Sequence, residues 1–206
     1  MRLRRFATVS VVLACSILAA CSKEQKSEQP APGAAKQISI ADQGFHGWDS
    51  MILRAPYARL DIVPALGGKI MGYEFRGRQI LWHDATREGE LYTNEGYGYG
   101  GSFFNPGGAK VWPAPQGWSG LSEWPGPPDN VLDGSPYEAS QEGEAVTVTG
   151  PADNGEGRTG LQFKHTYSLR KNSSVADLHL TMTNVVDRPV RWALWHLATV
   201  PVDRSA

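Results

Sequence analysis

The chain has 206 residues, a formal net charge of −1 at pH 7 and 20% charged residues. This near-neutral balance, without a basic patch, gives nucleic-acid binding no electrostatic support. Both cysteines, Cys15 and Cys21, lie near the N-terminus, so the rest of the chain must be held together by core burial without disulfides.

The first 20 residues have the pattern of a secretion signal. Residues 1–5 carry arginines, and residues 6–20 carry no charge. A basic start followed by a short apolar run is typical of a secretory signal. The run is also shorter than the roughly 20 apolar residues of a transmembrane helix. We therefore expect residues 1–20 to be a signal peptide.

The signal ends in the letters LAAC at residues 18–21, which resemble the lipobox of bacterial lipoproteins. The resemblance implies a diacylglycerol thioether on Cys21, cleavage just before it and a lipid anchor in the cell envelope. Ser22 follows the cysteine instead of an aspartate, and by resemblance to Gram-negative sorting this favours the outer membrane. The alternative is an ordinary secretion signal that happens to contain a cysteine.

A polar segment with proline, alanine and glycine, residues 21–36, follows as a predicted flexible tether. Beyond it, residues 37–206 are predicted to form one domain. Apolar and polar residues alternate there with a period of two, which indicates β-strands separated by turns. We therefore predict an all-β sandwich made of antiparallel meanders. The predicted strands cover residues 57–63, 69–75, 78–82, 144–149, 161–169, 175–184 and 190–200. The last is apolar on both faces, which indicates a central strand.

One long segment, residues 93–134, breaks this rhythm. It is rich in glycine and proline and carries Trp112, Trp118 and Trp124. Loops of this length are usually functional or disordered, and disordered segments are poor in aromatic residues. We therefore predict an ordered loop that folds over one face of the sandwich.

Several motifs resemble the galactose mutarotase-like superfamily. Residues 64–70, after a strand, and residues 80–82 are similar to its N-terminal hairpin. The letters GAKVWPAPQ at residues 108–116 resemble a signature of an uncharacterised bacterial branch, and residues 124–134 and 180–200 continue the similarity. The resemblance runs from about residue 50 to the end. It implies a β-supersandwich with a sugar-sized groove on one sheet.

Members of that superfamily are generally longer, and the general-base glutamate of the mutarotases lies in their C-terminal part. The resemblance therefore implies a sandwich that is incomplete at Ala206. A fragment, a frameshifted copy and an unusually short member remain open as explanations.

Mutarotation needs a positioned acid and a positioned base. In mutarotases the acid is a histidine on a strand shortly after an asparagine-containing hairpin, and His196 follows Asn184 at a similar interval. The spacing differs by about one residue, which would turn the side chain to the other face of the strand. His196 is thus the catalytic candidate, and a core histidine is the alternative. The sequence does not choose a base among Glu74, Glu88, Glu95 and Glu123.

The aromatic loop is the candidate binding site. The apolar C–H faces of sugar rings pack on indoles, while the sugar hydroxyls need a few fixed polar partners. The alternative is that the tryptophans pin the loop to the sandwich. The candidate binding residues are Lys110, Trp112, Gln116, Trp118, Trp124 and Asp133.

No cofactor or metal is predicted. His46, His83, His165 and His179 show no close metal-ligand spacing. Residues 96–101 satisfy the glycine pattern of dinucleotide-binding loops, but asparagine, proline and two glycines follow instead of the required helix.

Three functions remain open. The chain could be a membrane-anchored lipoprotein with a carbohydrate-binding domain, an aldose 1-epimerase-like enzyme, or an inactive fragment of a longer protein. The expected partners are a carbohydrate and a membrane reached through the lipid anchor.

We expect Cys21 to be acylated, because the lipobox ends at Ala20. Metabolic labelling with a palmitate analogue should mark the wild-type chain and leave the Cys21→Ser variant unmarked. Equal labelling of the two chains would show that the cysteine is incidental.

Overall fold

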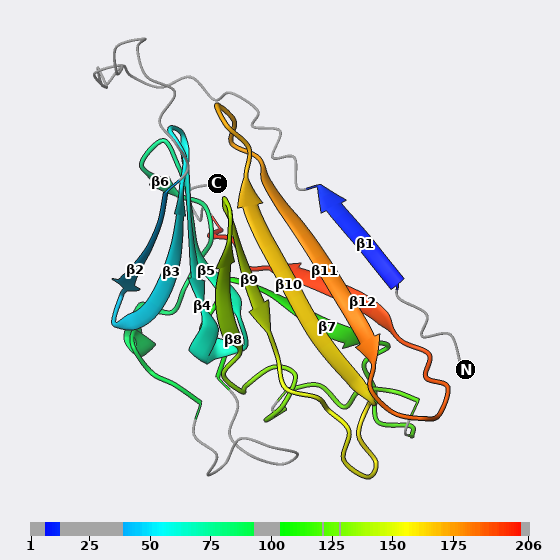
Figure 1. Cartoon of the computed structure of the whole chain (residues 1–206). Coiled ribbons are helices and arrows are strands. Elements are labelled where there is room, and N and C mark those ends of the chain that lie inside the picture. Colours follow the sequence, from blue (N-terminus) through cyan, green and yellow to red (C-terminus); the bar gives the residue numbers. More distant parts are fainter. Residues whose placement is uncertain (1–6, 13–38, 93–103, 121, 128, 203–206) are drawn as a thin grey trace.

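The computed structural model describes residues 7–12, 39–92, 104–120, 122–127 and 129–202. Two antiparallel sheets face each other, which confirms the predicted all-β sandwich (Figure 1). The helical elements of the described part are two single turns of 3-10 helix, η1 (Pro64–Leu66) and η2 (Ala85–Arg87). No helix among the described residues is long and apolar enough to cross a membrane.

The first sheet has five strands in the order β1-β11-β10-β9-β8. Its long strand β10 alternates as the sequence predicts, with Phe163, His165 and Tyr167 facing inward between polar neighbours. The strands are β1 (Ala7–Val12), β8 (Glu138–Glu142), β9 (Ala145–Thr149), β10 (Leu161–Leu169) and β11 (Ala176–Asn184).

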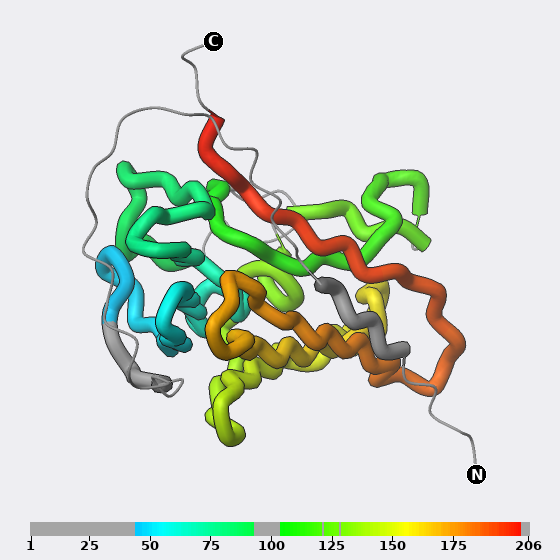
Figure 2. Tube along the Cα trace, turned by 90° about the horizontal axis from the view of Figure 1, so that it is seen from above, coloured from blue at the N-terminus to red at the C-terminus, as the bar shows by residue number. Residues whose placement is uncertain are grey.

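The second sheet has the order β12-β7-β5-β4-β3-β2, and the short strand β6 pairs with β5. The strands are β2 (Ser39–Phe45), β3 (Trp48–Arg54), β4 (Ala58–Val63), β5 (Lys69–Phe75), β6 (Arg78–Gln79), β7 (Ala109–Ala114) and β12 (Ala193–Ala198). In Figure 2, β7 and β12 (green and red) form one layer, and β10 and β11 (yellow to orange) form the other.

The position of β12 corrects one expectation. Residues 190–200 were predicted to contain a central strand, but β12 is the edge strand of its sheet and pairs with β7. Both of its faces are apolar for different reasons. Leu194 packs against the core, whereas Trp195 is 40% exposed on the other face and contacts Trp112.

The main core lies between the sheets. Leu53, Leu60 and Ile62 from the second sheet meet Val146 and Phe163 from the first, all with almost no exposed surface. A second cluster lies on the outer face of the second sheet and contains Phe45, Trp48, Val63, Leu66 and Met71. The second sheet is therefore covered on both faces where this cluster lies, whereas Trp195 on the edge strand β12 remains 40% exposed.

Strand β1 lies within the predicted signal peptide. It pairs antiparallel with β11, from Ala7 opposite Met182 to Val12 opposite Asp177 (Figure 1). Cys21 and residues 22–36 of the predicted tether lie outside the described residues.

His165 is a buried titratable group between the sheets. Its Nδ1 lies 3.0 Å from the Tyr167 hydroxyl, which donates to the Gly68 carbonyl at 2.9 Å. Its Nε2 has no hydrogen-bond partner among the described residues. Burial, reinforced by the nearby His196 and Lys69, lowers the pKa of His165 to about 3, so the ring is neutral at physiological pH.

We expect His165 to make the fold sensitive to acid. Its pKa is about 3 when folded against an ordinary value of 6.5, so below pH 6.5 the unfolded chain takes up a proton that the folded chain excludes. The stability of the folded chain is therefore not reduced by His165 above pH 6.5. As the pH drops from 6.5 towards 3, the free energy of unfolding falls by up to about 1.4 kcal/mol per pH unit.

Urea unfolding at a series of pH values measures this effect. Below pH 6.5, the free energy of unfolding should fall less steeply with decreasing pH in the His165→Leu variant than in the wild type. The difference in slope should be up to about 1.4 kcal/mol per pH unit, which corresponds to one proton. Equal slopes in the two chains would mean that His165 is not the group responsible.

Candidate functional site

Strand β7 presents two of the predicted binding residues on the outer face of the second sheet. Ala109 and Val111 belong to the core between the sheets. Because side chains alternate along a strand, Lys110 and Trp112 point the other way, towards the long loop. Both are nevertheless buried, with 7% and 8% of their surface exposed. Residues 93–134 were predicted to be one loop, but the segment contains β7. Of the loop residues after β7, Trp124 and Asp133 contact Trp112.

Asp133 fastens the loop to this face. Its Oδ1 accepts a hydrogen bond from Trp112 Nε1 at 2.7 Å and lies 3.0 Å from Lys69 Nζ. Lys69 Nζ also donates to the Asp133 carbonyl oxygen at 2.8 Å. Burial lowers the pKa of Lys69, and the Asp133 charge opposes that shift. Asp133 was predicted to contact sugar hydroxyls, but its carboxylate is engaged inside the protein.

Lys110 lies beside this ion pair. Its Nζ donates to Asn105 Oδ1 at 2.9 Å and lies 4.5 Å from the centroid of the Trp112 ring. Burial lowers its pKa to about 8, with the Asp133 charge acting against the shift and the Lys69 charge adding to it. An amine with this pKa has a deprotonated fraction near neutral pH, which is the property of a general base.

Trp124 is completely buried and has a structural role. Its Nε1 donates to Asp129 Oδ2 at 2.8 Å, and its ring lies 5.3 Å from that of Trp112. Gln116, which forms a β-bridge with Trp124, is exposed, and its amide nitrogen lies directly over Gly126. Trp112 and Trp124 therefore pin the loop, which is the alternative that the sequence left open for them.

Trp118 differs from the other two tryptophans of the loop. It is 81% exposed and lines a cleft of about 210 Å³ together with Glu123, Arg158 and Trp192. Gly117, Gly120, Pro125, Gly157 and Thr159 complete the lining. The cleft lies where the tip of the loop meets the turn between β9 and β10.

The charged walls of this cleft are held in place. The guanidinium of Arg158 contacts both oxygens of Asp129 at 3.0 Å, and its Nε lies 2.5 Å from Asp153 Oδ1. Glu123 Oε2 accepts a hydrogen bond from the Ser119 backbone amide at 2.8 Å. The sequence did not predict Arg158 as a site residue, because nothing in the turn before it indicates its partners Asp129 and Asp153.

Trp192 also lines the cleft. Its Nε1 donates to the Thr159 carbonyl at 3.1 Å, so its indole presents a ring to the cleft while its polar atom is already bonded. The sequence named Trp192 as part of the family resemblance but not as a binding residue.

His196 is separated from the predicted binding residues. It pairs with Val111, and Trp195 pairs with Trp112, so His196 faces the interior on the opposite side of the sheet from Trp112. Burial lowers its pKa. The structure therefore does not bring His196 together with Lys110 and Trp112.

The four candidate bases are scattered. Glu123 lies in the Trp118 cleft, Glu74 lies on β5, and Glu95 is outside the described residues. Glu88 contacts His46 and His83, two of the histidines that showed no metal-ligand spacing in the sequence.

No protein-family match is found for the chain, and no curated protein matches it. It is similar to a solved structure of a TPR-domain-containing protein from Parabacteroides distasonis, with 17% sequence identity and a TM-score of 0.42. The similarity covers 66% of this chain and 21% of that chain, so the chain spans about a fifth of that protein's length. A similarity at this level says nothing about activity.

We expect the Asp133→Asn variant to lose about 3–5 kcal/mol of unfolding free energy, because it leaves the buried Lys69 charge without its counterion. Thermal or urea unfolding measures the loss. The Asp187→Asn variant at an exposed turn is the control and should stay within about 0.5 kcal/mol of the wild type. Similar stability of both variants would contradict the role assigned to Asp133.

Proposed function

We propose that the chain is a lipid-anchored envelope lipoprotein whose β-sandwich domain, of the galactose mutarotase-like type, binds a carbohydrate in the Trp118 cleft. The observation that carries the proposal is an indole with 81% of its surface exposed beside an arginine held between two carboxylates. This arrangement combines an apolar platform with fixed polar groups, the two features that recognition of a sugar needs.

The platform is Trp118. A sugar ring packed on its indole would remove apolar surface from water on both partners. The cleft volume of about 210 Å³ is below the roughly 300–1,000 Å³ of sites for drug-sized ligands. It therefore favours one sugar residue, such as the end of a chain, over a long oligosaccharide.

The polar groups are Arg158 and Glu123. Hydroxyls both donate and accept hydrogen bonds, so a guanidinium and a carboxylate that line the same cleft suit a ring that carries several of them. Because Asp129 and Asp153 already immobilise Arg158, ligand binding costs little additional side-chain entropy there.

The lipid anchor rests on the sequence at residues 18–21. Cleavage before Cys21 would remove β1 together with the signal and leave β11 as the edge of the first sheet. Such an edge has unpaired backbone groups that are open to pairing with another strand.

An aldose 1-epimerase-like activity has weaker support. Glu123 lies in the cleft as a candidate base, but mutarotation also needs an acid. None of the described histidines lines the cleft, and His196 faces the interior of the sandwich. Binding without turnover is therefore the function that the geometry supports best.

We expect the Trp118→Ala variant to bind sugar about tenfold to a hundredfold more weakly, which corresponds to about 1–3 kcal/mol of lost stacking and buried area. Calorimetry and tryptophan fluorescence with a panel of aldoses and cell-wall sugars measure the affinity. Glu123→Gln should also weaken binding while retaining an acceptor for the Ser119 amide.

The control is Trp82→Ala, because Trp82 is also exposed, at 37%, and does not line the cleft. This variant should bind like the wild type. A folded wild-type chain that responds to no sugar of the panel would refute the proposal, as would equal losses in the Trp82 and Trp118 variants.

A further inference from the structure

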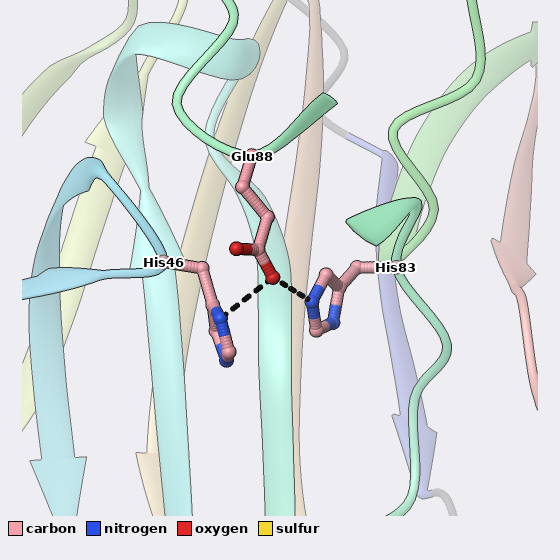
Figure 3. A group of neighbouring side chains, drawn as sticks. All are labelled: His46, His83 and Glu88. Carbon is pink, nitrogen blue, oxygen red and sulfur yellow. Dashed lines mark hydrogen bonds and ion pairs between the residues drawn. The ribbon is translucent and has the colours of Figure 1, made fainter. Parts of the chain in front are cut away.

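Three side chains from separate segments converge away from the Trp118 cleft (Figure 3). His46 lies in the turn between β2 and β3, His83 follows β6, and Glu88 follows η2. Glu88 Oε1 lies 2.7 Å from His46 Nδ1 and 2.9 Å from His83 Nε2. The three atoms all lie within 4.8 Å of one another.

The turns that carry His46 and Glu88 are in direct contact. A Cβ added to Gly47 would lie 3.1 Å from the Cα of Gly89. The absence of a side chain at Gly47 therefore allows the two turns to approach this closely. Trp48 Nε1 also donates to the Glu90 carbonyl at 2.7 Å, which ties the start of β3 to the segment after Glu88.

His83 is fixed independently. It forms a β-bridge with Gly107, and the following amide of Asp84 donates to the Pro106 carbonyl at 3.0 Å. The Asp84 carboxylate accepts from the Thr86 amide and so caps η2, the turn that leads to Glu88.

Phe45 supports both imidazoles. Its ring centroid lies 4.5 Å from that of His46 and 5.5 Å from that of His83, with an edge-to-face arrangement in each case. The side chain of His83 is 15% exposed, whereas His46 and Glu88 are 45% and 36% exposed. The cluster is therefore rigid on one side and open to solvent on the other.

We propose that His46, His83 and Glu88 bind a divalent transition-metal ion, with Zn²⁺ as the best fit. Two imidazole nitrogens and one carboxylate oxygen form a donor set typical of zinc sites with three protein ligands, which keep a fourth position open. Ca²⁺ and Mg²⁺ prefer sites built from oxygen ligands alone, so the two histidines select against them.

Metal binding requires the three ligand atoms to rearrange. With metal–ligand bonds of about 2.0–2.1 Å in a tetrahedral site, neighbouring donor atoms are roughly 3.3 Å apart. The present contacts between Glu88 and the two histidines are 2.7 and 2.9 Å, so the carboxylate has to retreat by about half an ångström. The ligand atoms lie within 4.8 Å of one another, so the two imidazoles also have to close on the ion. The exposed Glu88 and His46 can make this adjustment, and the metal replaces the protons that now join the three groups.

The open position faces solvent, since His46 and Glu88 are the exposed members of the cluster. It would hold water, or an oxygen or nitrogen atom from a molecule that approaches from outside. Sequence spacing did not point to these ligands, because the turn of one hairpin and two later loops bring them together.

Calorimetry and equilibrium dialysis with Zn²⁺ test the proposal on the untagged full-length chain extracted in detergent. The expected result is one ion per chain. Co²⁺ should give the visible absorption of a site with low coordination number and be displaced by Zn²⁺.

The His83→Ala, His46→Ala and Glu88→Gln variants should each bind Zn²⁺ at least about tenfold more weakly. Glu88→Gln keeps the shape of the side chain, so it remains informative if an alanine variant misfolds, which circular dichroism would show. The matched control is His179→Ala, because His179 is an exposed histidine on β11, and its affinity should equal that of the wild type.

Two results would overturn the proposal. One is the absence of stoichiometric Zn²⁺ binding by the folded wild-type chain. The other is binding that Glu88→Gln leaves unchanged or that His179→Ala weakens to the same extent, since either would place the ion elsewhere.

Discussion

The buried carboxylate of Asp133 is the constraint on which the arrangement of the long loop depends. Taking the Lys69 and Asp133 charges out of water costs several kcal/mol for each ion. The ion pair offsets this cost only because Asp133 also accepts from Trp112 and Lys69 also donates to the Asp133 carbonyl. The pair therefore favours one position of the loop, in which Asp133 and Trp124 cover Trp112 on the outer face of the second sheet.

A chain of contacts connects the Lys69–Asp133 ion pair to the Trp118 cleft. Trp112 contacts Trp124, and Trp124 donates to Asp129, which in turn holds Arg158. The Asp129 carboxylate also accepts from the amides of Val131 and Leu132, so it organises the loop backbone as well. The position of the cleft's guanidinium is thus set by contacts that begin at the buried ion pair.

Local alternation accounts for the part of the fold that the sequence predicted. Strands β10 and β11 follow the period-two pattern because each has one face in the core between the sheets. Strand β7 was missed because it contains Pro113 and lies in a segment rich in glycine and proline, a composition that indicates a loop. The β2–β3 hairpin was missed because Ser39–Phe45 carries polar and small residues.

Site residues were harder to predict than strands, for a physical reason. Asp133 and Glu123 have the same chemistry in the sequence, yet Asp133 is 2% exposed in an ion pair, whereas Glu123 lines an open cleft. Burial is decided by which segments the loop touches, and these contacts are distant in sequence. The same holds for His46 and His83, which only the meeting of separate loops places around Glu88.

The tryptophans differ in whether the indole N–H donates a hydrogen bond within the protein. A buried indole needs an acceptor, because leaving its N–H unpaired costs about 1–3 kcal/mol. Four tryptophans have an acceptor within the protein: Trp48 at the Glu90 carbonyl, Trp112 at Asp133, Trp124 at Asp129 and Trp192 at the Thr159 carbonyl. Trp118, at 81% exposure, leaves both its ring face and its N–H to solvent.

A single exposed apolar side chain is common on protein surfaces and needs no explanation by itself. Trp118 differs because Trp112 on β7 and Trp124 in the loop are both buried and hydrogen-bonded, and because it lines the same cleft as an arginine fixed by two carboxylates. Two buried anchors thus hold a loop whose described tip residues, 117–120 and 122–123, lie outside the buried core. The stability invested in positioning that tip is consistent with a partner from outside the chain that uses it.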